Sequence, residues 1–408
     1  MDFDPTPEEV ALRAEARAWL EANAEPYDAT ALETTRTYRA HTEEDDEAML
    51  ASAREWARTK AAARWAAPSW PEEYGGRALT PQLASVFGEE EATFDVIGRM
   101  FMVGTEMVGP TVIQWGTDEQ RDRWLEPILN ADDVWCQLFS EPGAGSDLAG
   151  LSTRAVRDGD EWVVNGQKVW TSAAHYANRG ILLARTDVDV PKHKGITAIV
   201  VDMGQPGVEV RPIRQIDGAI HFNEVFLTDV RVPVANTLGP EGMGWPVALT
   251  MLGHERASIG GGGMYTFEQV VQLAQECGRA DDPVIRQRLV DLYEHFELLR
   301  FIGYRVKTAL AKGEMPGGEA SVMKLLVSEL YERGGDLMVE ILGAGGMLTH
   351  EDAPYGGRFT DLFMGQWAPR IGGGTDQVQR NVIGERVLGL PGDLRADKTL
   401  PFKDLPKS

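Results

Sequence analysis

Glycine-rich stretches at two places in the chain could bind a ligand through backbone amides and small hydroxyl groups. The first is CQLFSEPGAGSDLAG, residues 136–150, where glycines permit close backbone approach and Ser140 and Ser146 add hydroxyl donors. This combination suits a flavin edge or a pantetheine-phosphate chain. An ordinary strand-to-loop turn is an alternative, because the spacing matches neither G-x-G-x-x-G nor the phosphate-binding loop. The second stretch, Gly372 to Gly374, can act only through its backbone.

A tryptophan and a serine lie two positions apart, at Trp170 and Ser172, in the run NGQKVWTSAAHYAN. Side chains alternate along a strand, so these two are expected on the same side of it. A flat aromatic ring beside a hydroxyl group can cover the face of a planar cofactor and hydrogen-bond to its edge. The alternative is a tryptophan that only fills the core, which is the more common role on a strand.

Other kinds of catalytic site are not indicated by the sequence. The histidines are scattered, without H-x-x-H or H-E-x-x-H spacing, so no metal site is expected. Cys136 and Cys277 lack C-x-x-C spacing, which argues against a zinc knuckle or a disulfide framework and fits a reducing cytoplasm. The G-x-S-x-G elbow of serine hydrolases is absent.

The segments that must position these residues fall into a helical, a β-rich and a second helical region. Thr6, Pro7 and Glu9 predict a capping box at the start of the first helix. In the β-rich region Asn165 and Gly166 predict a tight hairpin turn. The last region contains a bundle-type helical seam of Ile285, Leu289, Leu292, Phe296, Leu299, Gly303 and Val306. The chain is therefore predicted to be mainly α with a central β domain.

Composition limits the possible functions. The chain has 408 residues, enough for two or three packed units. Its formal charge of −23 disfavours binding to nucleic acid and to anionic lipid. The start, MDFDPTPEEV, lacks the features of a signal peptide, and no apolar run approaches the roughly 20 residues of a membrane span. We expect a cytoplasmic protein.

Several motifs in order along nearly the whole chain resemble the acyl-CoA dehydrogenase family. They are SEPGAGSDLAG, NGQKVWTSAAHYAN, FNEVFLTDVRVP, GPEGMGW and GGTDQVQRNVIGERVLGLP. The resemblance implies an N-terminal α-helical domain over residues 1–134, a middle β-barrel or β-sandwich domain over 135–244 and a C-terminal four-helix bundle over 245–408. It also implies FAD as cofactor, and removal of an α proton and a β hydride from an acyl-CoA thioester to give a 2,3-enoyl-CoA.

The resemblance also assigns roles to individual positions. Trp170 would stack near the flavin ring, Ser172 would approach N5, and Ser146 would lie where the coenzyme A arm passes. The family positions that contact FAD correspond here to Phe139, Ser140, Trp170, Ser172, Thr375 and Gln377.

The identity of the catalytic base follows from a departure within the family pattern. In many relatives the base is the glutamate of an I-Y-E-G-T segment, and Gly373 occupies that position here. Some members instead carry the base at the start of the first C-terminal bundle helix, where this chain has Glu255, followed by Arg256 as a substrate-binding residue. The amide N–H of Gly373 would still hold the thioester oxygen, because that contact needs no side chain. A helix-terminal glutamate paired with a nearby arginine is the alternative for Glu255.

Two further departures concern the adenosine half of FAD. The family's R-x-x-F-G run is missing from VQLAQECGRADDPVIRQRL, and Glu340 stands where a glutamine is usual. An acidic side chain near a pyrophosphate is unfavourable, although Arg286 could compensate. Two alternatives therefore stay open. The chain could be one subunit of a hetero-oligomer whose flavin site a related chain completes, or a flavin-dependent oxygenase or oxidase on the same fold.

The resemblance suggests partners as well. They are an acyl-CoA substrate, an electron-transfer flavoprotein or similar acceptor, and further copies of the chain in a homodimer or homotetramer.

Overall fold

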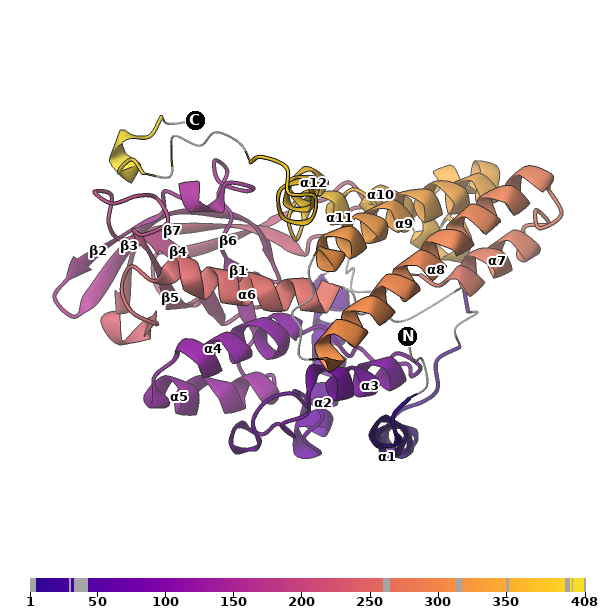
Figure 1. Ribbon diagram of the computed structural model, residues 1–408, viewed down its shortest axis with the longest axis horizontal. Helices are drawn as coiled ribbons and strands as arrows, with labels where there is room; N and C mark the ends of the chain where they lie inside the picture. Colours follow the sequence, from indigo (N-terminus) through magenta and orange to yellow (C-terminus); the bar gives the residue numbers. More distant parts are fainter. Residues whose placement is uncertain are drawn as a thin grey trace. The chain divides into compact units, whose positions relative to one another are not determined.

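The computed structural model describes residues 5–28, 31–32, 43–259, 265–312, 318–349, 352–392, 397 and 399–406. The chain forms two compact units, each assembled from separate stretches of sequence (Figure 1). Unit 1 comprises Met1–Thr37, Leu79–Val96 and Arg256–Gly392. Unit 2 comprises Tyr38–Ala78, Ile97–Glu255 and Asp393–Ser408. The predicted domain limits at residues 134 and 244 stay predictions.

The strands of the described residues form one sheet, which lies in unit 2 and confirms the predicted central β domain. The strands are β1 (Trp135–Leu138), β2 (Arg154–Asp158), β3 (Glu161–Ser172), β4 (Arg179–Arg185), β5 (Ile196–Asp202), β6 (Val208–Ile213), β7 (Phe222–Pro233) and β8 (Thr237–Leu238). Their order is β6-β7-β3-β2-β4-β5-β8, with β1 parallel to β4. The long antiparallel pair of β3 and β7 lies next to the edge strand β6.

The hairpin predicted at Asn165 and Gly166 is wrong. Both residues lie inside β3, where the pairing with β7 shifts register between Val164 and Gly166. A Cβ atom on Gly166 would come within 2.2 Å of Thr153 Oγ1, so the glycine is required by a close approach rather than by a turn. The chain instead turns between β2 and β3 at Gly159, which has φ +63°.

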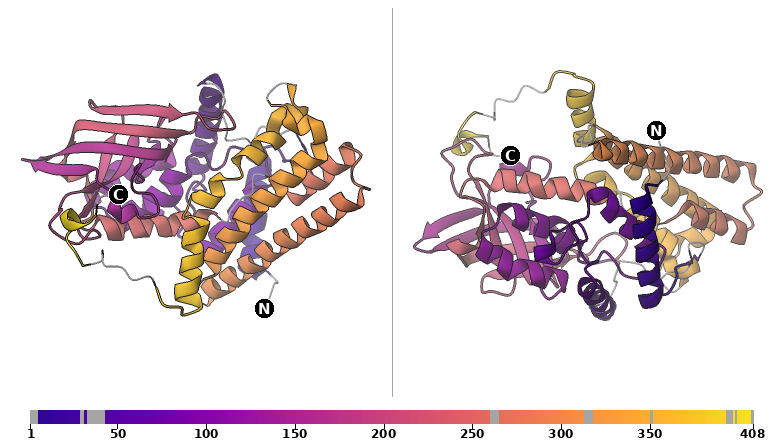
Figure 2. Two further views of the ribbon diagram at one scale, coloured as in Figure 1. Left: turned by 90° about the horizontal axis from the view of Figure 1, so that it is seen from above. Right: turned by 60° about the horizontal axis from the view of Figure 1, so that its bottom comes forward.

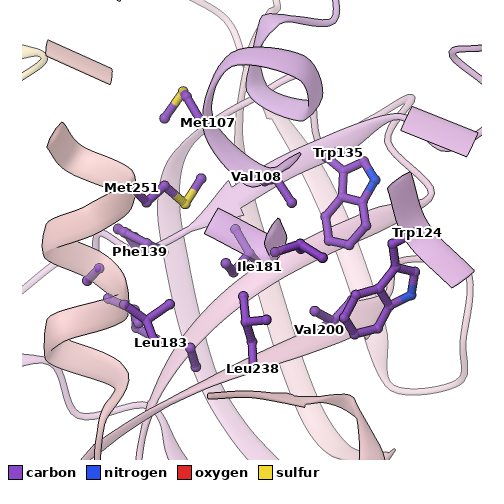
Figure 3. Close-up of a cluster of buried hydrophobic side chains, with 14 of the residues drawn as sticks. Met107, Val108, Trp124, Trp135, Phe139, Ile181, Leu183, Val200, Leu238 and Met251 are labelled. Carbon is purple, nitrogen blue, oxygen red and sulfur yellow. The ribbon is translucent and has the colours of Figure 1, made fainter. Parts of the chain in front are cut away.

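Helices pack with the sheet in unit 2. They are α2 (Glu43–Ala62), α4 (Gly109–Trp115), α5 (Asp118–Leu129) and α6 (Gly244–Ile259), with shorter turns at Glu72–Tyr74, Val103–Val108, Leu148–Gly150 and Val234–Asn236. Their core combines both kinds of element, as Figure 3 shows for Val108, Trp124, Trp135 and Ile181. The limit between the two units falls within α6.

Unit 1 is helical among its described residues. Its helices are α1 (Pro7–Asn23), α3 (Pro81–Glu91), α7 (Phe267–Glu276), α8 (Pro283–Ala311), α9 (Glu319–Leu342), α10 (Arg358–Gly365), α11 (Ala368–Ile371) and α12 (Asp376–Val382), with shorter turns at Gly343–Met347, Pro354–Gly357 and Ile383–Val387. The capping box of Thr6 and Glu9 is confirmed. The predicted seam lies on α8, where Ile285 and Leu292 are fully buried. No helix of the described residues is long and apolar enough to cross a membrane.

The last described residues return to the sheet of unit 2, and we call residues 399–406 the C-terminal clasp (Figure 2). Pro401 forms an antiparallel bridge with Pro191, and the Phe402 N–H donates to the Val190 carbonyl at 2.9 Å. The Lys403 N–H continues this pairing along the same loop. The clasp therefore adds backbone hydrogen bonds to the connection between β4 and β5.

The clasp also covers a buried cation. The Arg185 guanidinium is 3.8 Å from the centroid of the Phe402 ring, and Arg185 is only 3% exposed. Its other partners are backbone carbonyls, including that of Ala149 at 2.7 Å. A buried cation on an aromatic face is worth about 2 kcal/mol. The Phe402 ring therefore takes the place of solvent over this charge.

We expect Phe402→Ala to lower the free energy of unfolding by about 2 kcal/mol, because it uncovers the Arg185 cation and removes apolar contact. Urea denaturation followed by tryptophan fluorescence measures the change. Leu400→Ala, in the same clasp at 43% exposure, is the control and should change the free energy by less than about 0.5 kcal/mol. Equal effects of the two substitutions would contradict the role given to the ring.

Candidate active site

The loop after β1 brings Phe139 and Ser140 next to β3. Phe139 is buried in the core cluster drawn in Figure 3, and Ser140 is half-buried. The Ser140 carbonyl accepts a hydrogen bond from the Val169 N–H at 2.9 Å. Because Val169 directly precedes Trp170, this contact brings the glycine-rich loop and the tryptophan together.

Trp170 and Ser172 are both exposed, while Thr171 between them is buried. The Trp170 side chain is 59% exposed and meets the Phe222 ring edge-on, with centroids 5.9 Å apart. The alternative of a core tryptophan is therefore wrong. Trp170 has φ +60°, and the pairing of β3 with β7 shifts between Lys168 and Thr171. A bulky residue in this backbone region is strained, and such strain is typical of ligand sites.

A buried ion pair that no sequence motif indicates lies beneath the glycine-rich loop. The Lys168 ammonium, which is fully buried, donates to Glu141 Oε1 at 2.8 Å and to the Phe139 carbonyl at 3.0 Å. The Glu141 carboxylate also accepts backbone N–H groups of Ser152 and Thr153 at 2.7 and 2.9 Å. These contacts join β3 to both ends of the loop that carries Ser140 and Ser146.

Burial lowers the pKa of Lys168 to about 8, although the Glu141 charge opposes this shift. Burial would by itself raise the pKa of Glu141, but the Lys168 charge and the hydrogen bonds hold it below its usual range. Both groups are therefore charged at neutral pH, and each depends on the other for compensation.

The other glycine-rich stretch lies in unit 1, between α11 and α12. Gly373 and Gly374 have φ +64° and +90°, which glycine adopts without strain. The Gly373 carbonyl accepts from Gln379 Nε2 at 3.3 Å, and its amide N–H has no hydrogen-bond partner within the described residues. Thr375 caps α12 by accepting from the Val378 N–H at 3.2 Å. Gln377 is exposed.

Glu255 lies on the core-facing side of α6. Val247 and Met251 are fully buried, and Glu255 follows at the next four-residue step and is half-buried. Leu249, by contrast, is 46% exposed. Met251 belongs to the same cluster as Phe139 (Figure 3). A carboxylate is thus carried at the end of an apolar helix face.

Of the remaining predicted site residues, the structure describes some and not others. Ser146 is exposed in the loop before β2. The Arg256 side chain lies outside the described residues. So do Gly260 to Gly263, whose small size could leave room for a bulky or polycyclic acyl chain or could serve only close helix packing. No group of histidine, cysteine and acidic side chains suited to a metal ion occurs among the described residues.

Glu340, the acidic residue at a usual glutamine position, is paired within the chain. It forms an ion pair with Arg288 of α8, and its carbonyl accepts from Arg279 Nη1 at 3.4 Å. Arg286, which the sequence suggested as compensation, is exposed on the same helix. The arginine that neutralises Glu340 is therefore Arg288.

The described residues fit a bound FAD. An exposed indole held in a strained backbone offers a platform for a planar ring. Ser172 adds an exposed hydroxyl group on the same strand. A stacking surface and a hydroxyl donor are what a flavin ring requires. In unit 1, taken by itself, the backbone amide of Gly373 has no partner among the described residues and suits a thioester oxygen.

Family models of acyl-CoA dehydrogenases match three consecutive regions of the chain. The N-terminal domain matches residues 6–132, the middle domain 136–230 and the C-terminal domain 242–388. The chain is 40% identical over 346 residues to acyl-CoA dehydrogenase IpdE1 of Mycobacterium tuberculosis, covering 84% of this chain and 89% of that protein. It is 29% identical over 335 residues to the human mitochondrial short-chain specific acyl-CoA dehydrogenase, covering 78% of each.

Solved structures show the same likeness. A structure named Tcur3481-Tcur3483 steroid ACAD has a TM-score of 0.80 at 30% identity, covering 96% of this chain and 100% of that one. The ChsE4-ChsE5 complex from Mycobacterium tuberculosis has a TM-score of 0.76 at 30% identity, with the same coverage. The predicted fold class is thereby confirmed.

We expect Lys168→Met to lower the free energy of unfolding by about 3–5 kcal/mol, because it leaves the Glu141 carboxylate buried without a counter-charge. Thermal and urea denaturation measure the loss. The double variant Lys168→Met, Glu141→Gln should recover part of it. Lys194→Met, at an exposed lysine of the same unit, is the control and should have little effect. A single variant as stable as the wild type would contradict the pairing.

We expect Trp170→Ala to weaken FAD binding by about tenfold, the value of one aromatic stacking contact. The stability of the apoprotein should change by less than about 1 kcal/mol, because the indole is largely exposed. Titration of the apoprotein with FAD, followed by flavin fluorescence, measures the affinity. Val156→Ala, at 57% exposure on β2, is the control. Unchanged FAD affinity in Trp170→Ala would exclude the indole as a flavin contact.

Proposed function

Because the chain belongs to the acyl-CoA dehydrogenase family, we propose that it converts an acyl-CoA thioester to the 2,3-enoyl-CoA with Glu255 as the α-proton base. It is a FAD-dependent oxidoreductase, and FAD supplies the acceptor for the β hydride. The observation that carries the proposal is the position of Glu255, half-buried on the apolar face of α6 in a chain that has Gly373 at the usual glutamate position.

Proton removal needs a carboxylate and a stabilised oxyanion. The C2–H bond breaks, the proton passes to the Glu255 carboxylate, and the electron pair delocalises onto the thioester oxygen. Glu255 favours this role because it is a half-buried carboxylate that continues the apolar face of α6, and a general base must be a proton acceptor within reach of C2. The Gly373 N–H, which has no partner among the described residues, is the proposed donor to the oxygen.

The β-domain residues are proposed to hold the flavin and the coenzyme. Phe139, Ser140, Trp170 and Ser172 would bind and orient the ring system, and the exposure of the last two leaves them accessible for it. Thr375 and Gln377 are the proposed contacts from unit 1, and Ser146 and Arg256 those to the acyl-CoA. An electron-transfer flavoprotein is the proposed acceptor of the electrons.

We expect Glu255→Gln to lower kcat by about two to four orders of magnitude while FAD stays bound, because the amide cannot take the proton. A panel of CoA thioesters with an artificial electron acceptor measures turnover, and anaerobic bleaching of the flavin isolates the reductive half. Glu241→Gln, at an exposed glutamate of unit 2, is the matched control. Full activity in Glu255→Gln would end the assignment of the base.

The acyl group is proposed to be bulky and polycyclic. Two structures named steroid ACAD are among the similar solved structures, at 30% and 29% sequence identity. The test compares thioesters that carry a fused-ring acyl group with straight-chain ones. We expect at least about tenfold higher kcat/KM for the fused-ring group, the scale on which a shaped pocket discriminates. A preference for a short straight chain would exclude this substrate class.

A hetero-oligomer is the second candidate for the assembly. The Arg288–Glu340 ion pair favours a hetero-oligomer. Glu340 replaces the glutamine that usually contacts the adenosine half of FAD, and its side chain is already engaged by Arg288. One of the similar structures is itself named as a complex, ChsE4-ChsE5. A chain purified alone with stoichiometric FAD favours a homo-oligomer, and a colourless chain that gains FAD only on mixing with a paralogue favours the hetero-oligomer. The oxygenase or oxidase alternative has only the shared fold in its favour.

A further inference from the structure

A buried group of charged side chains surrounds Asp376, the residue that follows the glycine-rich loop of unit 1. Asp376 is 3% exposed. Its Oδ1 accepts from Lys324 Nζ at 2.8 Å and lies 2.9 Å from Ser328 Oγ. Its Oδ2 accepts from Arg370 Nε at 3.3 Å. Both carboxylate oxygens are therefore held by cations or hydroxyl groups. Burial opposes the charge on Asp376, but these partners keep its pKa below the usual range.

These contacts secure the two ends of the loop to one helix. Arg370 belongs to α11, which ends just before the glycines, and Asp376 is the first residue of α12, which follows them. Lys324 and Ser328 both project from α9. Ser328 Oγ also lies 3.1 Å from the carbonyl of Pro369, on the α11 side. The carboxylate thus joins both sides of the loop to a single rigid element.

Such anchoring matters because a run of glycines has the largest conformational freedom of any sequence. Inside the loop, Gln379 Nε2 donates to the Gly373 carbonyl at 3.3 Å. A Cβ atom on Gly374 would come within 2.7 Å of the same nitrogen, so this contact also requires glycine there. The Gly373 N–H belongs to the peptide that joins Gly372 to Gly373. On one side of this peptide the Gly372 N–H donates to the Ala368 carbonyl at 2.8 Å, and on the other side Gln379 holds the Gly373 carbonyl. The unpaired N–H between these two contacts therefore keeps one direction.

A buried ion pair is weak as a source of stability, because desolvation offsets most of the attraction. The contribution of the cluster is instead to fix the backbone of the loop that contains Gly373. We propose that Asp376, held by Lys324, Ser328 and Arg370, is a positioning residue that fixes the Gly373 N–H for the thioester oxygen. The inference rests on the proposed function, in which this N–H stabilises the enolate. Catalysis by such a donor depends on a position fixed within a fraction of an ångström.

The first test is Asp376→Asn, which keeps the size of the side chain and removes its charge. We expect kcat to fall by about ten- to a hundredfold, with KM changed less than about threefold, because a displaced oxyanion donor acts mainly on the transition state. FAD content and melting temperature are recorded alongside. Asp336→Asn, at an exposed aspartate on the same helix α9, is the matched control and should keep the wild-type kcat.

The second test measures proton removal without turnover. A thioester with sulfur in place of C3 can lose its C2 proton but has no C3 hydride to give. In D2O, exchange of its C2 hydrogen reports formation of the enolate and is followed by mass spectrometry. We expect Asp376→Asn to slow this exchange per FAD-bound molecule by the same factor as kcat. A merely structural role would lower the melting temperature or the FAD content and leave the exchange rate unchanged.

Ser328→Ala decides the question if Asp376→Asn does not fold. It removes one hydroxyl group from the cluster and keeps the ion pair, and we expect exchange and kcat to fall by about three- to tenfold. A folded, FAD-bound Asp376→Asn or Ser328→Ala with wild-type exchange and kcat would overturn the inference. If the wild-type protein neither exchanges nor oxidises any thioester in the panel, the proposed function itself fails, and this is seen before any variant is made.

Discussion

The ion pair of Lys168 and Glu141 is the interaction on which the candidate site residues of unit 2 depend. In a regular strand Lys168 and Trp170, two positions apart, would face the same side. Glu141 holds Lys168 inside, so the backbone of β3 must change course before Trp170 can reach solvent. The register shift after Lys168 and the positive φ of Trp170 mark that change. Burial of one charge thus explains the exposure of one ring.

In unit 1 a buried ion pair likewise holds a glycine-rich loop, the one that contains Gly373. There the backbone donor is a glycine peptide, and the buried pair is Lys324 with Asp376. In both units a segment rich in glycine is bordered by a carboxylate and an ammonium group removed from solvent. An ion pair in a low-dielectric interior is directional and tolerates little displacement, because each charge would be left uncompensated. Flexible sequence is in this way given a fixed geometry.

Local patterns predicted most of the fold. The capping box at Thr6 and the seam of α8 depend on residues close together in sequence, and both were correct. The turn at Asn165 was wrong because an Asn-Gly pair also suits a register shift inside a strand, and the close approach of Thr153 to Gly166 is not visible locally. Alternation predicts Trp170 and Ser172 on one side of the strand, and both are exposed, while their roles at the flavin stay predictions. The pairing of Arg288 with Glu340 joins two helices, and no spacing rule could have predicted it.

The C-terminal clasp makes the sheet of unit 2 depend on a segment that lies far behind the strands in the sequence. The clasp residues 399–406 leave the ribosome well after β8 and α6, and until then Arg185 has no Phe402 ring above it. Translation from the N-terminus therefore completes the strands before it can complete their cover. The Arg185 cation therefore stays uncovered while all the helices from α7 to α12 are being synthesised.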